Sequence, residues 1–412
     1  MVDFKSVSSI LPQNLGHVQT SVQEKLAAKA QGKERMRTGI LPIALIALAG
    51  SAQGQSIEML GSLGGSGSIA RDINDLGQIV GESLLAGDAV AHATIWNNGI
   101  ASDLGGLSAG DNSVAWAINN LGVAVGSNDL STGERTAALF QGGSVTNLGA
   151  MIGSQGNSVA WDINDTGVVV GQAPINPGFS KGFVWDATNG AQAAGTIPGY
   201  MGGANKAINN SGTIVGHSFF FGDPDNATLA TPDGRGGYDA FSIGPAGFNV
   251  SFATAISDSG IVVGHTNGGG AGGPTGGWQA VIYEPDGQGG TNYVPLGFLD
   301  GLSISEATDV NDDGLVVGFG LDGDGLGILP RAFAWHNGVM TDLNDLLTPD
   351  SDFVNLTQAT GVNAHGDIVG FGETRSGELA GFVIKGFVPA PGTGVLLAAA
   401  GLMASRRRRD NH

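Results

Sequence analysis

The sequence predicts an all-β protein, a seven-bladed β-propeller, on three observations. A twelve-residue motif recurs seven times at intervals of 45 to 54 residues. Each interval has room for two hairpins, or four short strands, which makes one propeller blade of about 45 residues. The first strand-like segment, from Ile57, has no motif before it, and the seventh repeat ends one strand short. The segment from Ile57 would therefore complete the last blade and close the ring without an exposed edge.

The composition excludes several other classes. Cysteine is absent, which rules out a disulfide scaffold, Cys-ligated zinc and thiol catalysis. Glycine accounts for 72 of the 412 residues but does not recur at every third position, so the chain is not collagen-like. A hydrophobic content of 41% is enough to build a core, unlike that of a disordered chain. The glycine excess therefore indicates many tight turns.

The charge is strongly acidic. The chain has 18 Lys and Arg residues against 37 Asp and Glu residues, a net charge of −19. Residues 55–391 hold only 8 of the basic residues and 33 of the acidic ones, so this region alone carries −25. Phosphate binding needs basic stripes, so we expect no nucleic-acid partner.

Residues 1–54 are predicted to be a leader and a helical signal peptide. Residues 39–49 form an apolar run of 11, preceded by Lys33, Arg35 and Arg37 and followed by small residues. This order is typical of a secretory signal, and the run is too short for a bilayer, which needs about 20 residues. A long leader and a start site at Met36 would both explain the preceding residues. A buried helix is the alternative.

Residues 55–386 contain the seven repeats, each built on the motif Ala-x-x-Ile-Asn-x-x-Gly-x-x-Val-Gly. We interpret the motif as a hairpin, in which Asn caps the turn and the first Gly accepts a positive φ. These positions are therefore assigned a structural role rather than a catalytic one. The near-invariant Ala indicates a crowded place, such as the innermost strand of a blade. The turn residues are Asn74, Gly77, Asn119, Gly122, Asn164, Gly167, Asn209, Gly212, Gly260, Asn311, Gly314, Asn363 and Gly366, with Ser257 replacing Asn in the fifth repeat.

A second motif predicts the third strand of each blade. It has five residues, and the fifth is always large and apolar. Several copies are followed by a Leu-Gly signature that we assign to the fourth strand, near Leu104, Leu148 and Leu296. The third copy departs from this signature, and the fourth is hard to place. The second motif begins at His92, Thr136, Lys181, Asp239, Gln279, Arg331 and Ala380.

Residues 387–412 have a three-part order. Val388, Pro389, Ala390 and Pro391 form an extended segment, an apolar stretch predicted as a short helix follows, and Arg406, Arg407, Arg408 and Arg409 lie near the end. By the positive-inside rule the arginines would stay on the cytoplasmic side of a membrane. This order resembles the PEP-CTERM sorting signal, which an exosortase reads in Gram-negative bacteria. The family pattern is Val-Pro-Glu-Pro, and here Ala390 replaces the Glu.

The repeats resemble the HAF family of extracellular repeats, named for the triplet His-Ala-Phe. His92-Ala93 keeps the first two letters, and Asp239-Ala240-Phe241 and Arg331-Ala332-Phe333 keep the last two. The resemblance covers about residues 57–385 and implies an extracellular or surface-associated protein. It supplies no catalytic activity that can be transferred residue by residue.

The loops between the second and third strands vary most, and variable loops on a rigid scaffold favour binding. Their predicted lengths run from nine residues (127–135) to 22 (217–238), and they are acidic. We expect a cationic ligand there, or a polysaccharide bridged by cations. Weak calcium binding is one interpretation of the acidic loop residues, and solvated loops without calcium are the favoured one. The residues are Asp322, Asp324, Asp223 and Asp225. The segment from Asp309 begins like an EF-hand loop but has Gly320 at the bidentate position, so we interpret it as the sixth repeat turn.

The sequence therefore predicts an exported cell-surface or matrix protein, a non-catalytic binding or structural module with no required cofactor. Its partners would be a signal peptidase, an exosortase-like enzyme, and extracellular polysaccharide or other surface proteins. The C-terminal segment would tether it to the membrane before processing. The alternative is a propeller hydrolase or lyase acting on extracellular polysaccharide. The histidines have no metal-ligand spacing, and no nucleophile elbow or phosphate loop appears.

Overall fold

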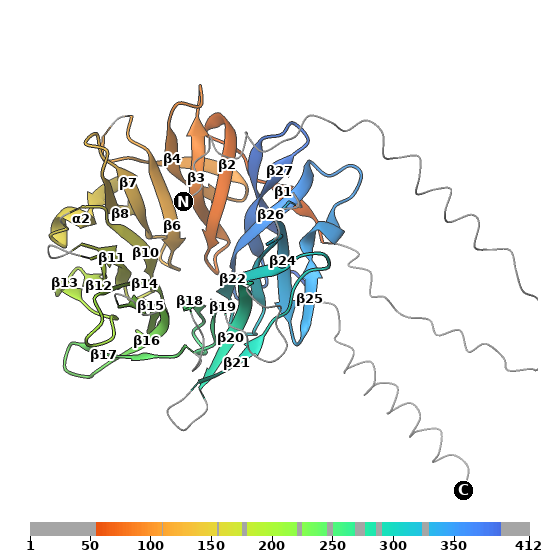
Figure 1. The fold of residues 1–412 in the computed structure, drawn as a ribbon. Helices are drawn as coiled ribbons and strands as arrows, with labels where there is room; N and C mark the ends of the chain where they lie inside the picture. Colours follow the sequence, from red (N-terminus) through yellow and green to blue (C-terminus); the bar gives the residue numbers. More distant parts are fainter. Residues whose placement is uncertain are drawn as a thin grey trace, which may run out of the picture. The chain divides into compact units, whose positions relative to one another are not determined.

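The computed structural model describes residues 55–388 except 109, 155, 175–178, 221–224, 245–249, 268–276, 286–290 and 324–328. In this part of the chain, 28 strands form seven antiparallel sheets of four strands each. Each sheet is one blade, and Figure 1 shows the blades arranged as a ring. The predicted seven-bladed β-propeller with four-stranded blades is confirmed.

Each blade uses four strands in chain order, from the channel outward, except the seventh. Blade 1 consists of β2 (Gly64–Ile73), β3 (Gln78–Leu85), β4 (Ala91–Asn97) and β5 (Ile100–Gly105). Blade 2 consists of β6 (Ser113–Ile118), β7 (Ala124–Asp129), β8 (Arg135–Gln141) and β9 (Ser144–Asn147). Blade 3 consists of β10 (Val159–Ile163), β11 (Val169–Ala173), β12 (Lys181–Asp186) and β13 (Gly190–Ala193). Blade 4 consists of β14 (Gly202–Ile208), β15 (Ile214–Phe219), β16 (Asn226–Pro232) and β17 (Tyr238–Ser242).

The remaining blades follow the same plan. Blade 5 consists of β18 (Val250–Ile256), β19 (Val262–Asn267), β20 (Gln279–Pro285) and β21 (Thr291–Pro295). Blade 6 consists of β22 (Ile304–Val310), β23 (Val316–Leu321), β24 (Arg331–His336) and β25 (Val339–Asp342). Blade 7 consists of β26 (Phe353–Val362), β27 (Ile368–Thr374), β28 (Leu379–Ile384) and β1 (Ile57–Met59). The described helices are one turn each, α2 (Leu148–Met151) and η2 (Leu343–Leu346).

The ring closes as the sequence predicts. Strand β1 pairs antiparallel with β28, with Ile57 opposite Ile384, and the backbone N–H of Leu60 donates to the carbonyl of Gly381 at 2.8 Å. Strand β2 in turn packs against β26, β27 and β28. The two ends of the repeat array are thus joined by hydrogen bonds in one sheet, and the outer edge of blade 7 is covered.

Blade 4 corrects one strand assignment. The segment from Asp239 was expected to be the third strand, but β16 is the third strand, and β17 takes Asp239 as the fourth. In the register of the other blades, Ala230 of β16 occupies the position filled by Trp96 in blade 1. Because Ala230 is small, the third strand of blade 4 does not match the second motif, which ends in a large apolar residue. The connection between the second and third strands therefore covers 220–225, not 217–238, and Asp233 lies in the turn between β16 and β17.

The Leu-Gly signature also behaves differently from the prediction. Leu104 and Gly105 end β5, Leu296 follows β21, and Leu148 begins α2. Gly105 and Gly297 have φ of +79° and +88°, which ends the pairing of the fourth strand. The leucine itself is buried in blades 2 and 5. The pair therefore terminates the blade and anchors its outer edge.

The core lies between neighbouring blades. One cluster joins Val125 of blade 2 to Val169 and Phe183 of blade 3, and the large residue of the second motif is buried, as with Trp96 and Phe140. The motif alanines of the innermost strands, such as Ala70 and Ala115, are fully buried, which confirms the crowded position expected for them. Each blade thus buries its two faces against its neighbours, and burial of apolar area is the main stabilising term.

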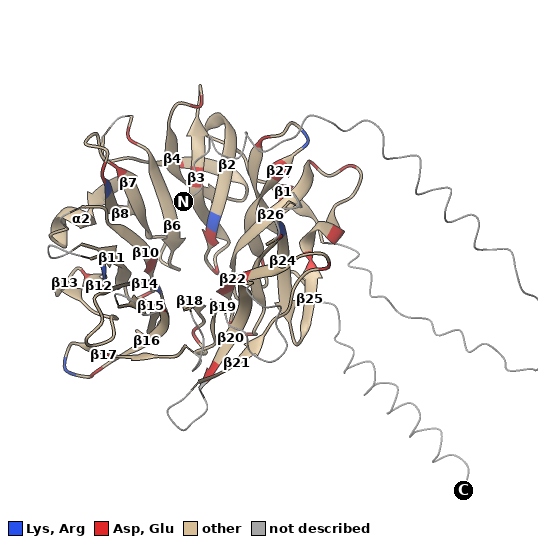
Figure 2. Ribbon diagram, in the orientation of Figure 1, with Lys and Arg blue, Asp and Glu red and all other residues tan. Residues whose placement is uncertain are grey.

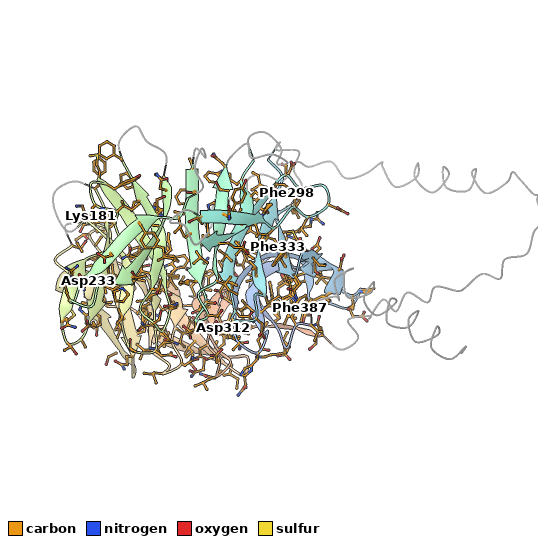
Figure 3. All side chains as sticks on the ribbon, turned by 90° about the horizontal axis from the view of Figure 1, so that it is seen from below. Lys181, Asp233, Phe298, Asp312, Phe333 and Phe387 are labelled. Atoms are coloured by element: carbon orange, nitrogen blue, oxygen red, sulfur yellow. The ribbon has the colours of Figure 1, made fainter. Side chains whose placement is uncertain are left out.

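The ring has two faces, which Figure 3 shows from the side. The Asn-x-x-Gly turns open on one face, where Asp312 lies, and the connections between second and third strands open on the other, next to Lys181. We call these the turn face and the loop face. Acidic segments outnumber basic ones over the ring (Figure 2), as the composition requires.

The predicted signal peptide (1–54) and all of the sorting segment beyond Val388 lie outside the described residues, as do the helices expected there. Phe387 is buried and donates its N–H to the carbonyl of Gly366, whereas Val388 is 74% exposed. Within the described ranges, no helix has the length and hydropathy needed to cross a bilayer.

Candidate functional site

The repeat turns join neighbouring blades around the channel. Within each blade the Asn side chain caps its own turn: Asn119 Oδ1 accepts from the N–H groups of Leu121 and Val123 at 3.1 and 3.0 Å. Gly122 then has a φ of +75°, which favours glycine. The other end of the amide is directed outward, because Asn119 Nδ2 donates to the carbonyl of Asn164 in the next blade at 3.0 Å.

These inter-blade bonds form a ring that we call the Asn belt. It has six links among the described residues, and it is interrupted at Ser257, whose hydroxyl accepts from Ile261 N in its own turn instead. Buried hydrogen bonds of this kind hold seven separate sheets in one closed array. The donors of the six links are Asn74, Asn119, Asn164, Asn209, Asn311 and Asn363.

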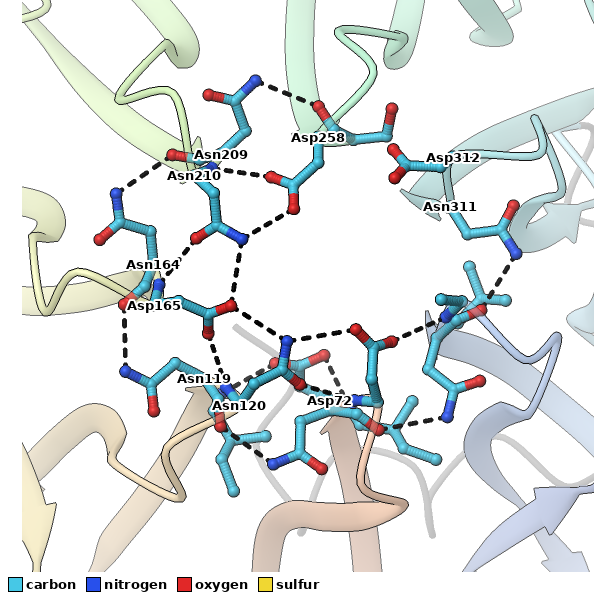
Figure 4. A pocket seen from close by; sticks show the side chains of 18 of the residues that line it. Asp72, Asn119, Asn120, Asn164, Asp165, Asn209, Asn210, Asp258, Asn311 and Asp312 are labelled. Carbon is cyan, nitrogen blue, oxygen red and sulfur yellow. Dashed lines mark hydrogen bonds between the residues drawn. The ribbon is translucent and has the colours of Figure 1, made fainter.

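A second ring of polar side chains lies at the mouth of the channel on the turn face (Figure 4). Asn120 Nδ2 donates to carboxylates of both neighbouring blades, Asp75 and Asp165, at 3.1 Å each. Asn210 likewise bridges Asp165 and Asp258. The hollow they surround holds about 190 Å³. These carboxylates accept hydrogen bonds from neighbouring blades, so we assign the ring to assembly of the propeller.

Three carboxyls lie beneath this mouth. Asp72, Asp162 and Asp309 each accept from two backbone N–H groups, one in their own blade and one in a neighbouring blade. Burial raises the pKa of Asp72 to about 6 and that of Asp162 to about 7, and it also raises the pKa of Asp309. No described Lys or Arg forms an ion pair with them, and these hydrogen bonds offset part of the cost of their burial.

Farther into the channel, all seven innermost strands have a β-bulge at the same place. In blade 2 the register passes from Ala115 directly to Ala117, which leaves Trp116 as the extra residue. The second Gly of the motif makes this possible: a Cβ on Gly126 would collide with the carbonyl oxygen of Val114 at the bulge. A bulge redirects a side chain out of the sheet. The motif therefore builds one bulge residue per blade at the wall of the channel.

The seven bulge residues fall into two groups. Blades 1 to 4 carry Arg71, Trp116, Trp161 and Lys206, which we call the cation–aromatic arc. Blades 5 to 7 carry Thr254, Thr308 and Thr360, which we call the threonine arc. The next position of the motif also varies, between Asp, Ala and Gly, but its carboxyls bond to backbone N–H groups of neighbouring blades. The bulge position is the one that brings large cationic and aromatic side chains to the channel wall.

The cation–aromatic arc is a continuous row of ring contacts across four blades. The Arg71 guanidinium lies 4.4 Å from the centre of the Trp116 ring, and the Trp116 and Trp161 ring centroids are 5.2 Å apart. The ammonium of Lys206 lies 3.5 Å from the centre of the Trp161 ring. Cation–π contacts hold both cations against aromatic faces. Arg71 also forms an ion pair with Glu82 of β3 at 2.6 Å.

Two histidines continue the arc on the second strands. His217 and His265 follow the second motif Gly of blades 4 and 5, and both rings contact Phe252, with centroids at 4.8 and 5.2 Å. Burial, with the nearby charge of Lys206, lowers the pKa of each histidine to about 4, so both are neutral at pH 7. Burial also lowers the pKa of Lys206 to about 8. Lys206 is half-buried.

The arc contains polar atoms that are buried and have no hydrogen-bond partner among the described residues. They are Arg71 Nε, Trp161 Nε1, His217 Nδ1 and His265 Nδ1. Orphaned buried polar atoms are rare in folded proteins because each costs free energy. The threonine arc differs, since Thr254, Thr308 and Thr360 donate to carbonyls of the next blade at 2.8 to 3.1 Å. The cation–aromatic arc is therefore the candidate binding site.

Of the residues weighed for calcium, the two that the structure describes lie in different blades. Asp225 precedes β16 in blade 4 and Asp322 follows β23 in blade 6, while Asp223 and Asp324 lie outside the described residues. No group of three or more His, Asp or Glu side chains with metal-binding geometry occurs in the described ranges. Burial raises the pKa of Asp225, which is a cost of desolvation rather than a sign of a bound cation.

The arc was not predicted from the sequence, because the second position of the motif was left unspecified. The signal was present: seven nearly identical motifs differ there as Arg, Trp, Trp, Lys, Thr, Thr and Thr. A position that is variable inside a constant frame is where a repeat protein places its specificity.

Comparisons with known proteins give a partial family match and distant folds. A family model described as "Protein of unknown function (DUF3466)" matches residues 207–380. No curated protein matches the chain. Among solved structures, the β-propeller domain of the Trilobed protease from Pyrococcus furiosus has 11% identity and a TM-score of 0.44, and the match covers 79% of this chain and 99% of that one.

Two further structures are similar at the same level. A mutant of AofleA from Arthrobotrys oligospora has 12% identity and a TM-score of 0.37, over 70% of this chain and 90% of that one. TolB from Acinetobacter baumannii has 12% identity and a TM-score of 0.38, over 55% of this chain, which spans only 54% of TolB. At these identities and scores, none of the three bears on the function of this chain.

Proposed function

We propose that this chain is an exported, non-catalytic binding module whose ligand enters the channel and contacts the cation–aromatic arc. The observation that carries the proposal is the set of buried polar atoms in the arc that lack partners. Four of the nine such atoms among the described residues lie in the arc and its two histidines, whereas the hydroxyls of the threonine arc all have partners. A ligand with several polar groups would supply the missing bonds.

Extracellular polysaccharide is the ligand class we propose, with the cell surface of a Gram-negative-type bacterium as its setting. The support comes from the sequence: the signal-like segment, the sorting-like segment and the HAF-like repeats all favour export. Tryptophan faces and convergent donors also suit a sugar ring, which presents an apolar face and a rim of hydroxyls. The sorting-like segment would hold the protein in the membrane until an exosortase-like enzyme cleaves it.

A glycan panel tests the binding proposal on the full chain. We expect retention of a subset of polysaccharide fragments, and loss of that retention in Trp161→Leu. The matched control is Thr308→Ser, a change at the same bulge position in the threonine arc that keeps its hydroxyl. Retention that is equal in both variants would contradict a site in the arc. Depolymerisation of a bound fragment would favour the alternative of a carbohydrate-active enzyme.

Mass spectrometry of the mature termini after cell fractionation tests export. We expect the chain at the cell surface with both ends shortened, and a chain lacking residues 388–412 to be missorted. A truncated chain that still reaches and stays on the surface would contradict the sorting proposal.

A further inference from the structure

Most of the few basic residues of the propeller pair with a carboxylate. Of the 8 Lys and Arg residues within 55–391, five pair with carboxylates: Arg71, Arg135, Arg235, Arg331 and Lys385. Arg375 donates to the carbonyls of Pro349 and Ser351. Lys181 and Lys206 make no ion pair with any residue that the structure describes. Lys181 begins β12, a third strand away from the channel, so Lys206 is the unpaired cation of the channel.

Lys206 is unpaired in a protein with 33 carboxylates in the same region. Its ammonium is held against Trp161, and the titratable groups that interact with it are two neutral histidines, His217 of β15 and His265 of β19. An ammonium removed from water without an anion is costly. A ligand of opposite charge would offset this cost.

The other orphaned atoms point to the same chemistry. Arg71 Nε and Trp161 Nε1 can only donate hydrogen bonds, and a neutral histidine donates from one ring nitrogen. The Arg71 charge is balanced by Glu82, which leaves Lys206 as the only net charge of the arc. One positive charge held against an indole whose N–H lacks a partner matches a single carboxylate or a comparable oxyanion.

We infer that the cation–aromatic arc binds the anionic group of an acidic saccharide at its Lys206 end, with the Lys206 ammonium as counter-charge and Trp161 Nε1 as donor. This inference rests on the proposed binding function and narrows its ligand class. The acidic loops between the second and third strands led us to expect a cationic ligand. For the channel, we now infer an anionic one. The acidic surface repels anions over a distance of about 8 Å at physiological salt, so selectivity arises only inside the channel.

Calorimetric titration of the full chain at 0.15 M salt tests the inference with three matched probes: D-glucuronate, D-glucuronamide and D-glucose. They differ in the group at C6, which is charged only in glucuronate. We expect glucuronate to bind more tightly than the other two by about ten- to a hundredfold, the range of a charge-assisted hydrogen bond. Lys206→Met should remove this preference, and Lys206→Arg should keep most of it.

Two further variants separate the site from the fold. Trp161→Phe keeps the ring beside the ammonium and removes only the indole N–H, so we expect a weaker loss, about tenfold. Lys181→Met is the control, because it removes the other unpaired lysine outside the channel. It should leave the glucuronate affinity unchanged.

The outcomes are distinct. Equal binding of glucuronate and glucose, both sensitive to Trp161→Phe, would overturn the inference and leave the proposed binding function standing. Inorganic sulfate that binds with the same dependence on Lys206 while glucuronate does not would keep the anion site and overturn the saccharide source. If none of the probes binds and the glycan panel is also negative, the proposed function and the inference both fail.

Discussion

The two arcs of the channel wall occupy the same backbone position and use it in opposite ways. In blades 5 to 7 the bulge residue is Thr, and its hydroxyl donates to the carbonyl of the next blade, as Thr308 does to Ala359 at 2.8 Å. In blades 1 to 4 it is Arg, Trp, Trp or Lys, and donors are left without partners among the described residues. All seven blades therefore have the same backbone bulge. The side chain at the bulge determines whether the blade bonds to its neighbour or presents groups to a ligand.

The largest effect on stability is expected from substitution of the motif glycine that permits the bulge. A Cβ on Gly126 in blade 2 or on Gly264 in blade 5 would meet the carbonyl oxygen of Val114 or Phe252. We expect Gly126→Ala and Gly264→Ala each to lower the free energy of unfolding by about 3 kcal/mol, because the bulge must move. Urea unfolding measures the change. If one substitution were harmless, the bulge would not be a frame common to both arcs.

Lys206→Met should stabilise the ligand-free protein, by about 1 to 3 kcal/mol at pH 7, because it removes a desolvated charge and keeps the packing on Trp161. The effect has a defined pH window. The pKa of Lys206 is lowered from 10.5 to about 8 in the folded protein, so between these values the unfolded chain binds more protons. The stability of the wild type should therefore rise with pH in this window relative to the variant.

Thermal unfolding of the two proteins at pH 7, 9 and 10.5 measures this relation. We expect the difference in stability between Lys206→Met and the wild type to shrink steadily as the pH rises. If the wild type were more stable than the variant at pH 7, an interaction within the protein would already offset the cost of burying the Lys206 charge.

Thr308→Val should destabilise the protein, in contrast to Lys206→Met. The isosteric valine cannot donate to Ala359 or to Val317, so we expect a loss of about 1 kcal/mol. The same unfolding assay measures it, and ligand binding should be unchanged. A stabilising Thr308→Val would erase the difference between the two arcs.

The smallest effect is expected at the gap in the Asn belt. Ser257 lacks the amide that would donate to the next blade, so Ser257→Asn should add the missing link toward Asn311 and gain about 0.5 to 1 kcal/mol. Asn119→Ser is the reverse change in an intact link and should lose a similar amount. An equal loss in both variants would mean that blade 5 is adapted to the serine.

Much of the fold could be predicted because the sequence repeats it. The recurring Asn-x-x-Gly turn fixed the hairpins, the intervals fixed the number of blades, and the unmatched segment at Ile57 indicated the closure with β28. Local chemistry and register are enough for these features, since each depends on residues near one another in the chain. Blade 4 was misassigned because Ala230 stands where an aromatic residue marks the third strand elsewhere.

The site could not be predicted in the same way, because it depends on closure of the ring. Arg71, Trp116 and Trp161 are 45 residues apart along the chain, and only the propeller stacks them. The bulge is invisible in a pattern that reads every strand as a simple alternation. The Asn belt was missed for the same reason: the turn explained one end of each amide, and the second end needs the neighbouring blade.

The central claim is that the cation–aromatic arc is built to hold a ligand, and the indole N–H of Trp161 tests it most directly. It has no partner among the described residues, whereas the indole N–H of Trp96 donates to Gly61 at 2.6 Å and is an internal control. In a titration of ¹⁵N-labelled protein with D-glucuronate, we expect the Trp161 resonance to shift downfield and saturate while that of Trp96 stays in place. A Trp161 resonance that does not move, or that moves no more than that of Trp96, would contradict the account.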